Sequence, residues 1–483
     1  MALLSEQDLA LVKSLSSRLA SYDYGNEQRE AYYRGRYYAP SLGIGIPPNS
    51  VLNKVTVGWA STVVDTIEER IEFLGWSDAS GEDDELLSAV YESSDVGSES
   101  SAVHSDALMY GIGFLSVTAG GAGEPEVLVR AHSARSTTAE INPRTGLVEA
   151  GITYHSNREA TLWKRDEVVE LVRGSEHGVW EVAERIPHSM GRVPLVAVVN
   201  RTRAGDRRGR SEITPGIITA INSATHALRA MDVNREFFST PQRYGIGLSE
   251  ENFEGVDSWK LISTRMLLAP RDEEEGTEPK FGEFSTVSPG PYLDQIKGLA
   301  SLVATESGIP ESYFNIPHSN PTSADAVRAM ENRLIKRAER RCRQFTSPWV
   351  EVGRLARAVV TGHLDVEDSP RARWADPATP TLAATTDAMV KAVQSGVLPV
   401  GEVVWRRMGL SEHEIESVES VQAEARAADR LARLANITRG VSEEALIAAG
   451  GEAYGRNADG RGANGGANAG SAGGGGAAVP AGS

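Results

Sequence analysis

Cysteine, long apolar runs and an excess of basic charge are all scarce or missing in this sequence of 483 residues. The single cysteine, Cys342, cannot form an intrachain disulfide and leaves no second thiol for a cysteine-based zinc site, which fits a reducing compartment. No apolar run approaches the roughly 18 residues of a membrane span. The N-terminal MALLSEQDLALVKSL has no basic region followed by a continuous apolar one, so we expect an amphipathic helix and no signal peptide.

The charge balance limits the contacts that this chain can make with nucleic acid. It has 66 acidic and 49 basic residues and a formal net charge of -17. A protein that holds DNA or RNA over most of its surface carries a basic excess. Any contact of this chain with DNA must therefore be local or weak.

The sequence contains no motif for nucleotide or metal chemistry. The Gly-x-Gly pairs at 43/45, 111/113 and 245/247 lack the third glycine of a dinucleotide-binding loop, so each predicts a turn. The segment GDRRGRS lacks the lysine of a phosphate-binding loop, which argues against an ATPase. The segment HEIES, which starts at residue 413, has no second histidine at metal-ligand spacing and is typical of a solvated helix face.

No nucleophile or acid–base pair is recognisable either. His104 and Asp106 are two positions apart on a predicted helix, so their side chains point in different directions. A satisfied or exposed histidine is therefore the simpler interpretation. Cys342 falls on an apolar helix stripe, where a packed thiol is expected. We predict that the chain is not an enzyme and has no catalytic residue, cofactor or metal site.

Helical patterns in the first part of the chain give way to β-strand patterns. After the N-terminal helix, apolar spacing predicts a buried-face helix within 55–71, with Asn49 or Ser50 as its cap. A further helix ends at Gly111. Short β-rich runs then fill 114–200, and we expect them to form a mostly antiparallel sheet.

Two predicted helices bracket a small β-like insert. Ser211 is expected to cap the first helix, which has Glu212 in its first turn and covers 211–240. The insert, 241–290, has the β-like runs RMLLAP and PKFGEFS on either side of the acidic tip RDEEEG. The second helix covers 291–307.

The densest positive charge lies in NPTSADAVRAMENRLIKRAERRCRQF, residues 320–345. Thr322 predicts the start of a helix that has one apolar stripe, with most of the basic residues on the opposite face. The pattern continues past Pro348, which we expect to kink the helix rather than end it. The loop NRTRAGDRRGR at 200–210 is a second basic feature. Each could meet phosphate or carboxylate groups, or simply be a solvated charged face.

Taken in order, these segments resemble the portal, or head-to-tail connector, protein family of tailed bacteriophages, in particular the siphophage type. The similarity runs from about residue 20 to 450 and lies in the ordered series rather than in a single motif. The matching segments are YYRGRYY, the helix at Trp59 to Asp65, DALMYGIGF, GRVPLVAVVNR, GRSEI, SGIPESYF, NPTSADAVRAMENRLIKRAERR, RWADPATPT and SGVLPVGEVVWRRMGLS.

The resemblance implies an α+β fold. It would be a portal-type ring protomer with a mainly helical wing, stem and crown, an antiparallel β region in the wing and a small β-containing clip. Its parts would be the wing (1–210), stem helix 1 (211–240), the clip (241–290), stem helix 2 (291–307), the tunnel loop (308–322), a long kinked wing helix (323–362), the helical crown (363–450) and a disordered Gly/Ala-rich tail (451–483).

The family's function follows as an expectation. A portal protein forms a dodecameric ring at one capsid vertex, the channel through which double-stranded DNA is packaged and ejected. The implied partners are further copies of the chain, the terminase large subunit, a head-completion or adaptor protein, the major capsid and scaffold proteins, and DNA without sequence preference, but no membrane. We expect assembly in the host bacterial cytoplasm and a final location at the portal vertex of the virion. The alternatives are another head-vertex or minor head protein, and an unrecognised cytosolic hydrolase.

Three sets of residues are predicted to serve this function. The tunnel-loop set is Glu311, Tyr313, Asn315, His318 and Asn320. The docking tip of the clip is Asp272, Glu273, Glu274 and Glu275. The basic helix face, which would meet neighbouring subunits or DNA, is Arg333, Lys336, Arg337, Arg340 and Arg343.

A DNA channel constrains where the basic face can lie. A stem helix of roughly 30 residues spans about 45 Å, and a duplex inside it exposes roughly 26 phosphate charges. Even weak attraction at each phosphate would add up to a trap, so a sliding channel needs a weakly repulsive wall, which fits the acidic excess. We therefore expect the basic helix face to lie away from the lumen and to meet acidic surfaces of neighbouring subunits. Contact with DNA packed inside the head is the alternative.

Overall fold

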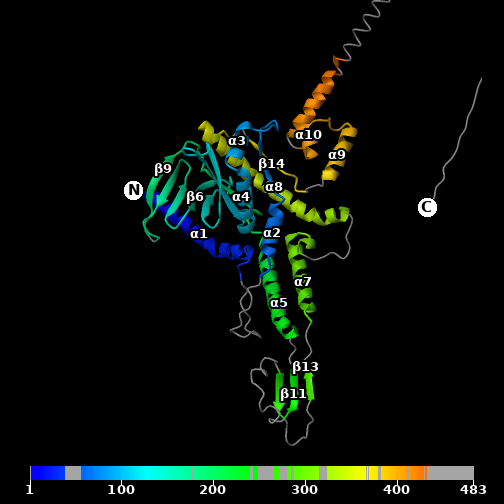
Figure 1. Cartoon of the computed structure of the whole chain (residues 1–483). Coiled ribbons are helices and arrows are strands. Elements are labelled where there is room, and N and C mark those ends of the chain that lie inside the picture. The colour runs from blue at the N-terminus through cyan, green and yellow to red at the C-terminus, as the bar shows by residue number, and fades with distance from the viewer. Residues whose placement is uncertain are drawn as a thin grey trace, which may run out of the picture. The chain divides into compact units, whose positions relative to one another are not determined.

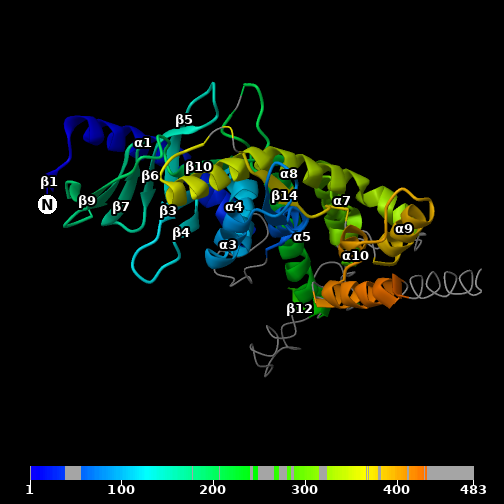
Figure 2. The same ribbon diagram turned by 90° about the horizontal axis from the view of Figure 1, so that it is seen from above.

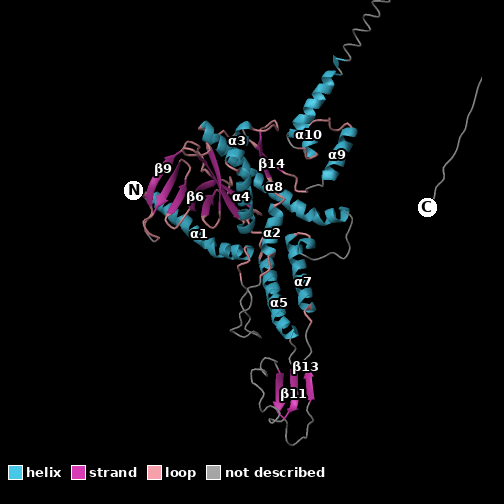
Figure 3. Cartoon of the chain, viewed as in Figure 1, coloured by secondary structure: helices cyan, strands magenta, loops and turns pink. Residues whose placement is uncertain are grey.

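The computed structural model (Figure 1) describes most of the chain, and Figure 3 separates its helices from its strands. The described residues are 2–37, 56–176, 178–205, 207–239, 243–248, 266–270, 280–283, 288–314, 324–365, 367, 369–378, 382–410, 413–428 and 430–431. The chain divides into two compact units, Met1–Thr379 and Pro380–Ser483. Helices and mainly antiparallel sheets are combined, so the predicted α+β class is confirmed.

The N-terminal helix packs on a six-stranded antiparallel sheet. Helix α1 (Glu6–Tyr33) begins at Ser5, whose hydroxyl accepts a hydrogen bond from the backbone N–H of Asp8. Val12 and Leu15 are buried against the sheet. The strands, in spatial order, are β1 (Ala2–Leu3), β9 (Glu181–Pro187), β8 (Glu167–Val172), β7 (Glu159–Trp163), β6 (Val148–Tyr154) and β5 (Thr137–Ile141).

Asp8 ties the start of α1 to this sheet through a partly buried ion-pair network. Its side chain is nearly inaccessible and accepts hydrogen bonds from Lys164 Nζ and Arg185 Nη2, each at 2.8 Å. Both cations also reach Glu167 Oε1, at 2.7 Å. Burial by itself raises the pKa of Asp8, but the hydrogen bonds from Lys164 and Arg185 outweigh it and lower the pKa to about 2.

A three-stranded sheet forms the centre of the larger core. Its order is β10 (Leu195–Val199), β3 (Ile112–Ala119) and β4 (Val127–His132), and all pairs are antiparallel. Helix α8 lies across this sheet (Figure 2). Among the helices that contribute to this core are α2 (Trp59–Glu68), α3 (Glu85–Ser93), α4 (Val96–Tyr110) and α8 (Ala324–Thr361). The predicted antiparallel β region is therefore present, as two sheets rather than one.

Gly111 and His104 fix the path of α4. Gly111 ends the helix as predicted, with φ 97°, a conformation that favours glycine, and the chain turns directly into β3. His104 is buried, and its Nε2 accepts a hydrogen bond from Trp349 Nε1 at 2.9 Å. Burial lowers the pKa of His104 to about 3, so the ring is neutral near pH 7. The interpretation as a satisfied histidine is confirmed. The cap predicted at Asn49 or Ser50 lies outside the described residues.

Helix α8 continues through Pro348, as predicted. Its apolar stripe is buried at Leu334, Ala338 and Phe345, and Cys342 is a packed thiol as expected. After α8 the chain forms β14 (Arg371–Trp374), which pairs with β2 (Phe73–Ser77). These residues therefore belong to the first compact unit, although the crown was predicted to begin at 363. The assignment of wing, stem, clip and crown stays a prediction.

Two long helices pack side by side (Figure 1). They are α5 (Pro215–Ser239) and α7 (Gly290–Ser307), close to the predicted ranges. Ala224 of α5 and Ala304 of α7 are among their buried residues. The 3-10 helix η2 (Glu311–Phe314) follows α7.

A small sheet lies between α5 and α7 in the chain. Its order is β12 (Met266–Pro270), β11 (Arg243–Leu248) and β13 (Lys280–Glu283), with β12 parallel and β13 antiparallel to β11. The turn predicted at the glycine pair 245/247 is wrong, because both glycines lie within β11. The strands on either side of the acidic tip pair with β11 rather than with each other. The pair 43/45 lies outside the described residues.

The second unit is helical where it is described. It contains α9 (Leu382–Gln394), α10 (Glu402–Arg407) and a helix over 413–428. In the HEIES segment, His413 is exposed, in line with the predicted solvated helix face, whereas Ile415 is buried. Among the described residues, no helix combines the length and apolarity needed to cross a membrane. The tail predicted at 451–483 lies outside the described residues.

Replacing Asp8 tests the network that holds α1. The pKa of Asp8 lies below its ordinary value of 3.8, so its contribution to stability is complete above about pH 4 and is lost as the pH falls towards 2. We expect Asp8→Asn to destabilise the protein by roughly 2 kcal/mol at pH 7. The difference from wild type should shrink in acid, as measured by urea unfolding followed by circular dichroism. Glu6→Gln on the same helix is the control, and a difference that does not change with pH would contradict this account.

Candidate functional site

The positive charge of α8 divides into an inner and an outer set. Arg341 is 3% exposed and Arg337 is partly buried. Lys336, Arg340 and Arg343 are exposed, and we call these three residues the outer basic face. The predicted face of five residues therefore mixes two roles, because Arg337 and Arg333 make contacts within the chain.

Glu212 and Arg341 form a buried ion pair. Arg341 donates from Nε at 3.0 Å and from Nη2 at 2.6 Å to Glu212 Oε1. Arg201 Nη1 lies 3.4 Å from the other carboxylate oxygen, and Asn200 Nδ2 donates to Oε1 at 3.1 Å. Glu212 is 1% exposed, so the pair is withdrawn from water and its hydrogen bonds compensate the loss of hydration.

The segment before α5 differs from the prediction. Ser211 does not cap a helix and Glu212 is not in its first turn, because α5 begins at Pro215 and the hydroxyl of Thr214 accepts from the N–H of Ile217. Instead, Ser211 Oγ donates to the carbonyl of Met109 at 2.5 Å, and Glu212 N donates to that of Leu108 at 2.8 Å. These carbonyls belong to the last turn of α4, which needs partners outside its own helix.

The charge of Arg341 decides the ionisation of Glu212. Burial by itself raises the pKa of this carboxyl group. The positive charges of Arg341 and Arg201, with the hydrogen bonds from Arg341, outweigh burial and hold the pKa of Glu212 below its ordinary value. Glu212 is therefore a carboxylate at neutral pH, and its contribution to stability is lost only as the pH falls through that lowered pKa.

The end of α7 lies against two more arginines of α8, one of which is hydrogen-bonded to it. Arg337 Nη2 donates to the carbonyl of Glu306 at 3.0 Å, in the last helical turn, where carbonyls lack partners and a cation is favoured. Arg333 lies over Gly308, which ends α7 with φ 70°. The Glu306 carboxylate accepts a hydrogen bond from the hydroxyl of Thr214.

Together these contacts join three helices at one place. We call it the α5–α7–α8 junction, and its residues are Thr214, Glu212, Glu306, Gly308, Arg333, Arg337 and Arg341. Because the small sheet β11–β13 is linked to the protein only through α5 and α7 in the chain, the junction fixes the place where α5 begins and α7 ends.

The arginine loop at 200–210 is also partly internal. The guanidinium of Arg208 lies 3.5 Å from the ring centre of Tyr22 on α1, and burial lowers its pKa to about 10. Arg201 reaches Glu212, as described above. Arg203 and Arg207 remain exposed. Two alternatives were predicted for this loop, a binding loop and a solvated charged face. Neither includes the structural contacts that Arg201 and Arg208 make within the chain.

Two of the predicted tunnel-loop residues are bound to neighbouring helices. Glu311 accepts a hydrogen bond from the hydroxyl of Ser301 on α7. The Tyr313 hydroxyl accepts from Arg70 Nη2 at 2.9 Å and donates to Glu331 Oε1 at 3.2 Å. The rest of that set, and the whole predicted clip tip, lie outside the described residues: Asn315, His318, Asn320, Asp272, Glu273, Glu274 and Glu275.

Sequence reasoning missed Glu212 as the partner of the basic helix. A signal was present, because Glu212 is an acidic residue between the arginines of the loop and the apolar start of α5. No group of three or more histidine, cysteine, aspartate or glutamate side chains could hold a metal ion in the part of the chain that the structure describes.

A small β module inserted between two paired helices, which are anchored to a long basic helix, is the organisation expected of a portal-type protomer. The family model described as "Phage portal protein, SPP1 Gp6-like" matches residues 25–431, and the chain belongs to this family. Membership makes it a structural protein of a phage particle.

Two relatives from mycobacteriophages agree with this assignment. The portal protein of Mycobacterium phage L5 is 29% identical over 420 residues, covering 82% of this chain and 82% of the relative. The portal protein of Mycobacterium phage D29 is 30% identical over 391 residues, covering 76% and 78%.

Solved structures give a more distant likeness. One is described as the virion of a native gene transfer agent (GTA) particle; its chain is 13% identical, with a TM-score of 0.42, over 73% of this chain and 90% of that chain. Another, the neck of an empty GTA particle computed with C6 symmetry, has the same identity and TM-score over 74% and 90%. The family assignment rests on the sequence matches.

A double-mutant cycle tests the buried pair. Arg341→Met leaves Glu212 without its main partner, and Glu212→Gln leaves Arg341 charged in the core, so each should cost roughly 3–5 kcal/mol. The double variant should lose much less than the sum, because neither charge is then left alone. Urea unfolding measures all three variants, and Arg340→Met, on the exposed face of the same helix, is the control. Additive losses would show that the two side chains do not depend on each other.

Proposed function

We propose that the chain assembles into a dodecameric ring at one vertex of the phage capsid, and that the ring is the channel for packaging and ejecting double-stranded DNA. The match of the portal family over residues 25–431 carries this proposal. In the ring, α5 and α7 form the stem and the small sheet β11–β13 forms the clip. Residues 1–210 and α8 form the wing, and the helices of the second unit belong to the crown.

The net charge of the chain supports a channel whose wall does not bind DNA tightly enough to stop its movement. Helix α5 has 25 residues and is therefore about 37 Å long, so a duplex beside it exposes roughly 22 phosphate charges. A few tenths of a kcal/mol of attraction at each phosphate would stop movement. Twelve chains together carry roughly -204 charges (12 × -17), which opposes such a trap.

The partners follow from the same proposal. The clip would bind the terminase large subunit during packaging and a head-completion or adaptor protein afterwards. The wing and crown would contact the major capsid and scaffold proteins. The ring would assemble in the host cytoplasm and remain at the portal vertex of the virion, and the chain would have no enzymatic activity of its own.

The outer basic face serves ring assembly in this proposal. Its residues Lys336, Arg340 and Arg343 are exposed, while Arg337 and Arg341 of the same helix are engaged inside the chain. A neighbouring copy has an acidic excess and offers carboxylates to this face. Contact with DNA packed inside the head is the competing role for the same residues.

Electron microscopy of the purified protein tests the proposed assembly directly. Negative-stain images should show rings of about a dozen subunits around a central hole, and the mass from light scattering should agree, because the portal family closes head-to-tail contacts into a ring. A monomer that persists across salt and protein concentration, also with scaffold protein present, would contradict the proposal.

Charge reversal on the outer basic face tests its role. Arg340→Glu combined with Arg343→Glu should raise the protein concentration needed for ring formation by roughly tenfold, since like charges would then meet at each contact. Arg337 is left unchanged because it holds α7. The control is Lys13→Glu with Arg158→Glu, which changes the net charge equally at exposed positions elsewhere. Intact rings with reduced DNA packaging would assign the face to DNA, and intact rings with normal packaging would exclude both roles.

A further inference from the structure

The outer edge of β10 has backbone groups that face away from its sheet. Val117 N donates to the carbonyl of Pro194 at 3.1 Å, and Asn200 N donates to that of Gly111 at 2.9 Å. Along an antiparallel pair, the backbone N–H and C=O groups of successive residues point alternately towards the partner strand and away from it. The two bonds show that in β10 the backbone groups of the even-numbered residues point towards β3. The N–H and C=O groups of Leu195, Ala197 and Val199 therefore point to the other side.

Two other sheet edges in this unit, those of β4 and β5, are partly covered by side chains. On β4, Ser94 Oγ donates to the carbonyl of Val127 at 2.5 Å, and Ala131 N donates to Glu99 Oε2 at 2.6 Å. On β5, Arg18 Nη1 donates to the carbonyl of Ala139 at 3.2 Å. Natural sheets close their edges in such ways because an open edge pairs with other chains.

The β10 edge has no such cover among the described residues. No hydrogen bond from another described residue reaches the outward groups of Leu195, Ala197 or Val199. Leu195 is 2% exposed and Ala197 is 9% exposed, so these groups lie in a largely buried environment. A buried backbone group without a partner is costly, which indicates that something else pairs with this edge.

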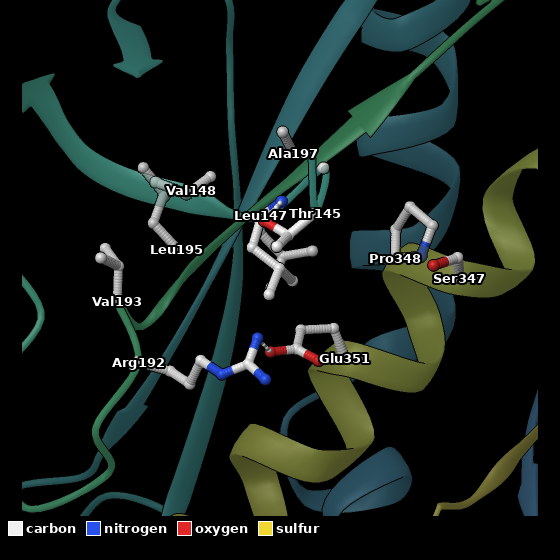
Figure 4. A pocket seen from close by; sticks show the side chains of 12 residues that line it. Thr145, Leu147, Val148, Arg192, Val193, Leu195, Ala197, Ser347, Pro348 and Glu351 are labelled. Carbon is white, nitrogen blue, oxygen red and sulfur yellow. Dashed lines mark hydrogen bonds and ion pairs between the residues drawn. The ribbon is translucent and has the colours of Figure 1, made fainter. Parts of the chain in front are cut away.

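A groove runs along the same edge. Two cavities of about 100 and 380 Å³ share Gly146, Ala197 and Pro348 in their walls. Figure 4 shows the smaller one, between β10, the turn before β6 and α8. A side chain added at Gly146 would meet nothing within 4 Å, so this wall is open. Pro348 has no N–H, so it cannot donate to the carbonyl of Gln344, which lines the larger cavity.

The two ends of the groove differ in charge. Beyond Val199, the exposed Arg203 and Arg207 line the larger cavity, and neither has an ion-pair partner among the described residues. At the other end, Arg192 is paired with Glu351 at 3.3 Å (Figure 4). An occupant with a carboxylate near the Val199 end would complement the basic end of the groove, while the Arg192 end is already neutralised by Glu351.

We propose that an extended segment of a neighbouring copy of this chain adds to β10 as a further strand and places a carboxylate between Arg203 and Arg207. Main-chain hydrogen bonds to Leu195, Ala197 and Val199 give this contact its strength, and the arginines set its direction. The inference rests on the proposed ring. A ring requires two different surfaces that meet head to tail, and a groove with an inserted segment is such a pair. The acidic excess of the chain supplies the complementary charge.

Hydrogen exchange of the full chain tests the proposal. Mass spectrometry of peptic fragments that cover 193–200 should show slow exchange at the three outward N–H groups in rings. In dilute monomer the exchange should be faster by roughly a hundredfold, because an unpaired edge is not protected. Fragments that cover β4 should differ little between the two states.

Two variants separate edge pairing from general damage. Ala197→Pro removes one outward N–H and keeps the bonds to β3, so it should raise the concentration needed for ring formation by roughly tenfold. Arg203→Glu with Arg207→Glu should act in the same direction without touching the backbone. Lys13→Glu with Arg158→Glu is again the control, and circular dichroism checks that each variant is folded.

The outcomes distinguish this inference from the proposed function. Rings in which 195–199 exchange as fast as in the monomer overturn the strand pairing and leave the portal function standing. Protection that is already present in the monomer also overturns it, because the chain then covers its own edge. A chain that forms no rings under any condition overturns the proposed function and this inference together.

Discussion

The buried ion pair between Glu212 and Arg341 is the interaction on which the arrangement of the first unit depends. It joins the start of α5 to the middle of α8, while the backbone of Glu212 is bonded to the end of α4. Both side chains are nearly inaccessible to water, so neither can be replaced alone without leaving an uncompensated charge. The rest of the fold thus fixes the point at which α5 begins and α7 ends.

This pair explains why so many basic residues gather in an acidic chain. Arg341 neutralises Glu212, Arg337 binds the end of α7, and Arg333 lies over Gly308. Positive charge on the inner side of α8 is therefore used to hold helix ends, where carboxylates and free carbonyls gather. The outer basic face, Lys336, Arg340 and Arg343, is left for other molecules. In the proposed ring, this one helix would link the position of the paired helices to contacts with neighbouring subunits.

Much of this organisation could be predicted from local patterns. The ranges of α5, α7 and α8 follow from apolar periodicity, and Gly111 marks a helix end because only glycine adopts its backbone conformation easily. The role of Ser211 could not be predicted, because a hydroxyl before a helical pattern fits a cap as well as it fits a bond to Met109, which is distant in sequence. Glu212 and Arg341 are 129 positions apart, and no local pattern couples them. Gly245 was misjudged because pairing on both sides of β11 outweighed the turn preference of glycine.

A cryo-EM map of the assembled ring, at a resolution that shows side chains, tests the central claim that α8 has an anchoring side and an assembly side. We expect Arg341 to remain on Glu212 of its own subunit, and Lys336, Arg340 and Arg343 to lie within ion-pair distance of carboxylates on the neighbouring subunit. A ring in which Arg341 has left Glu212, or in which the outer basic face lines the lumen, would contradict it.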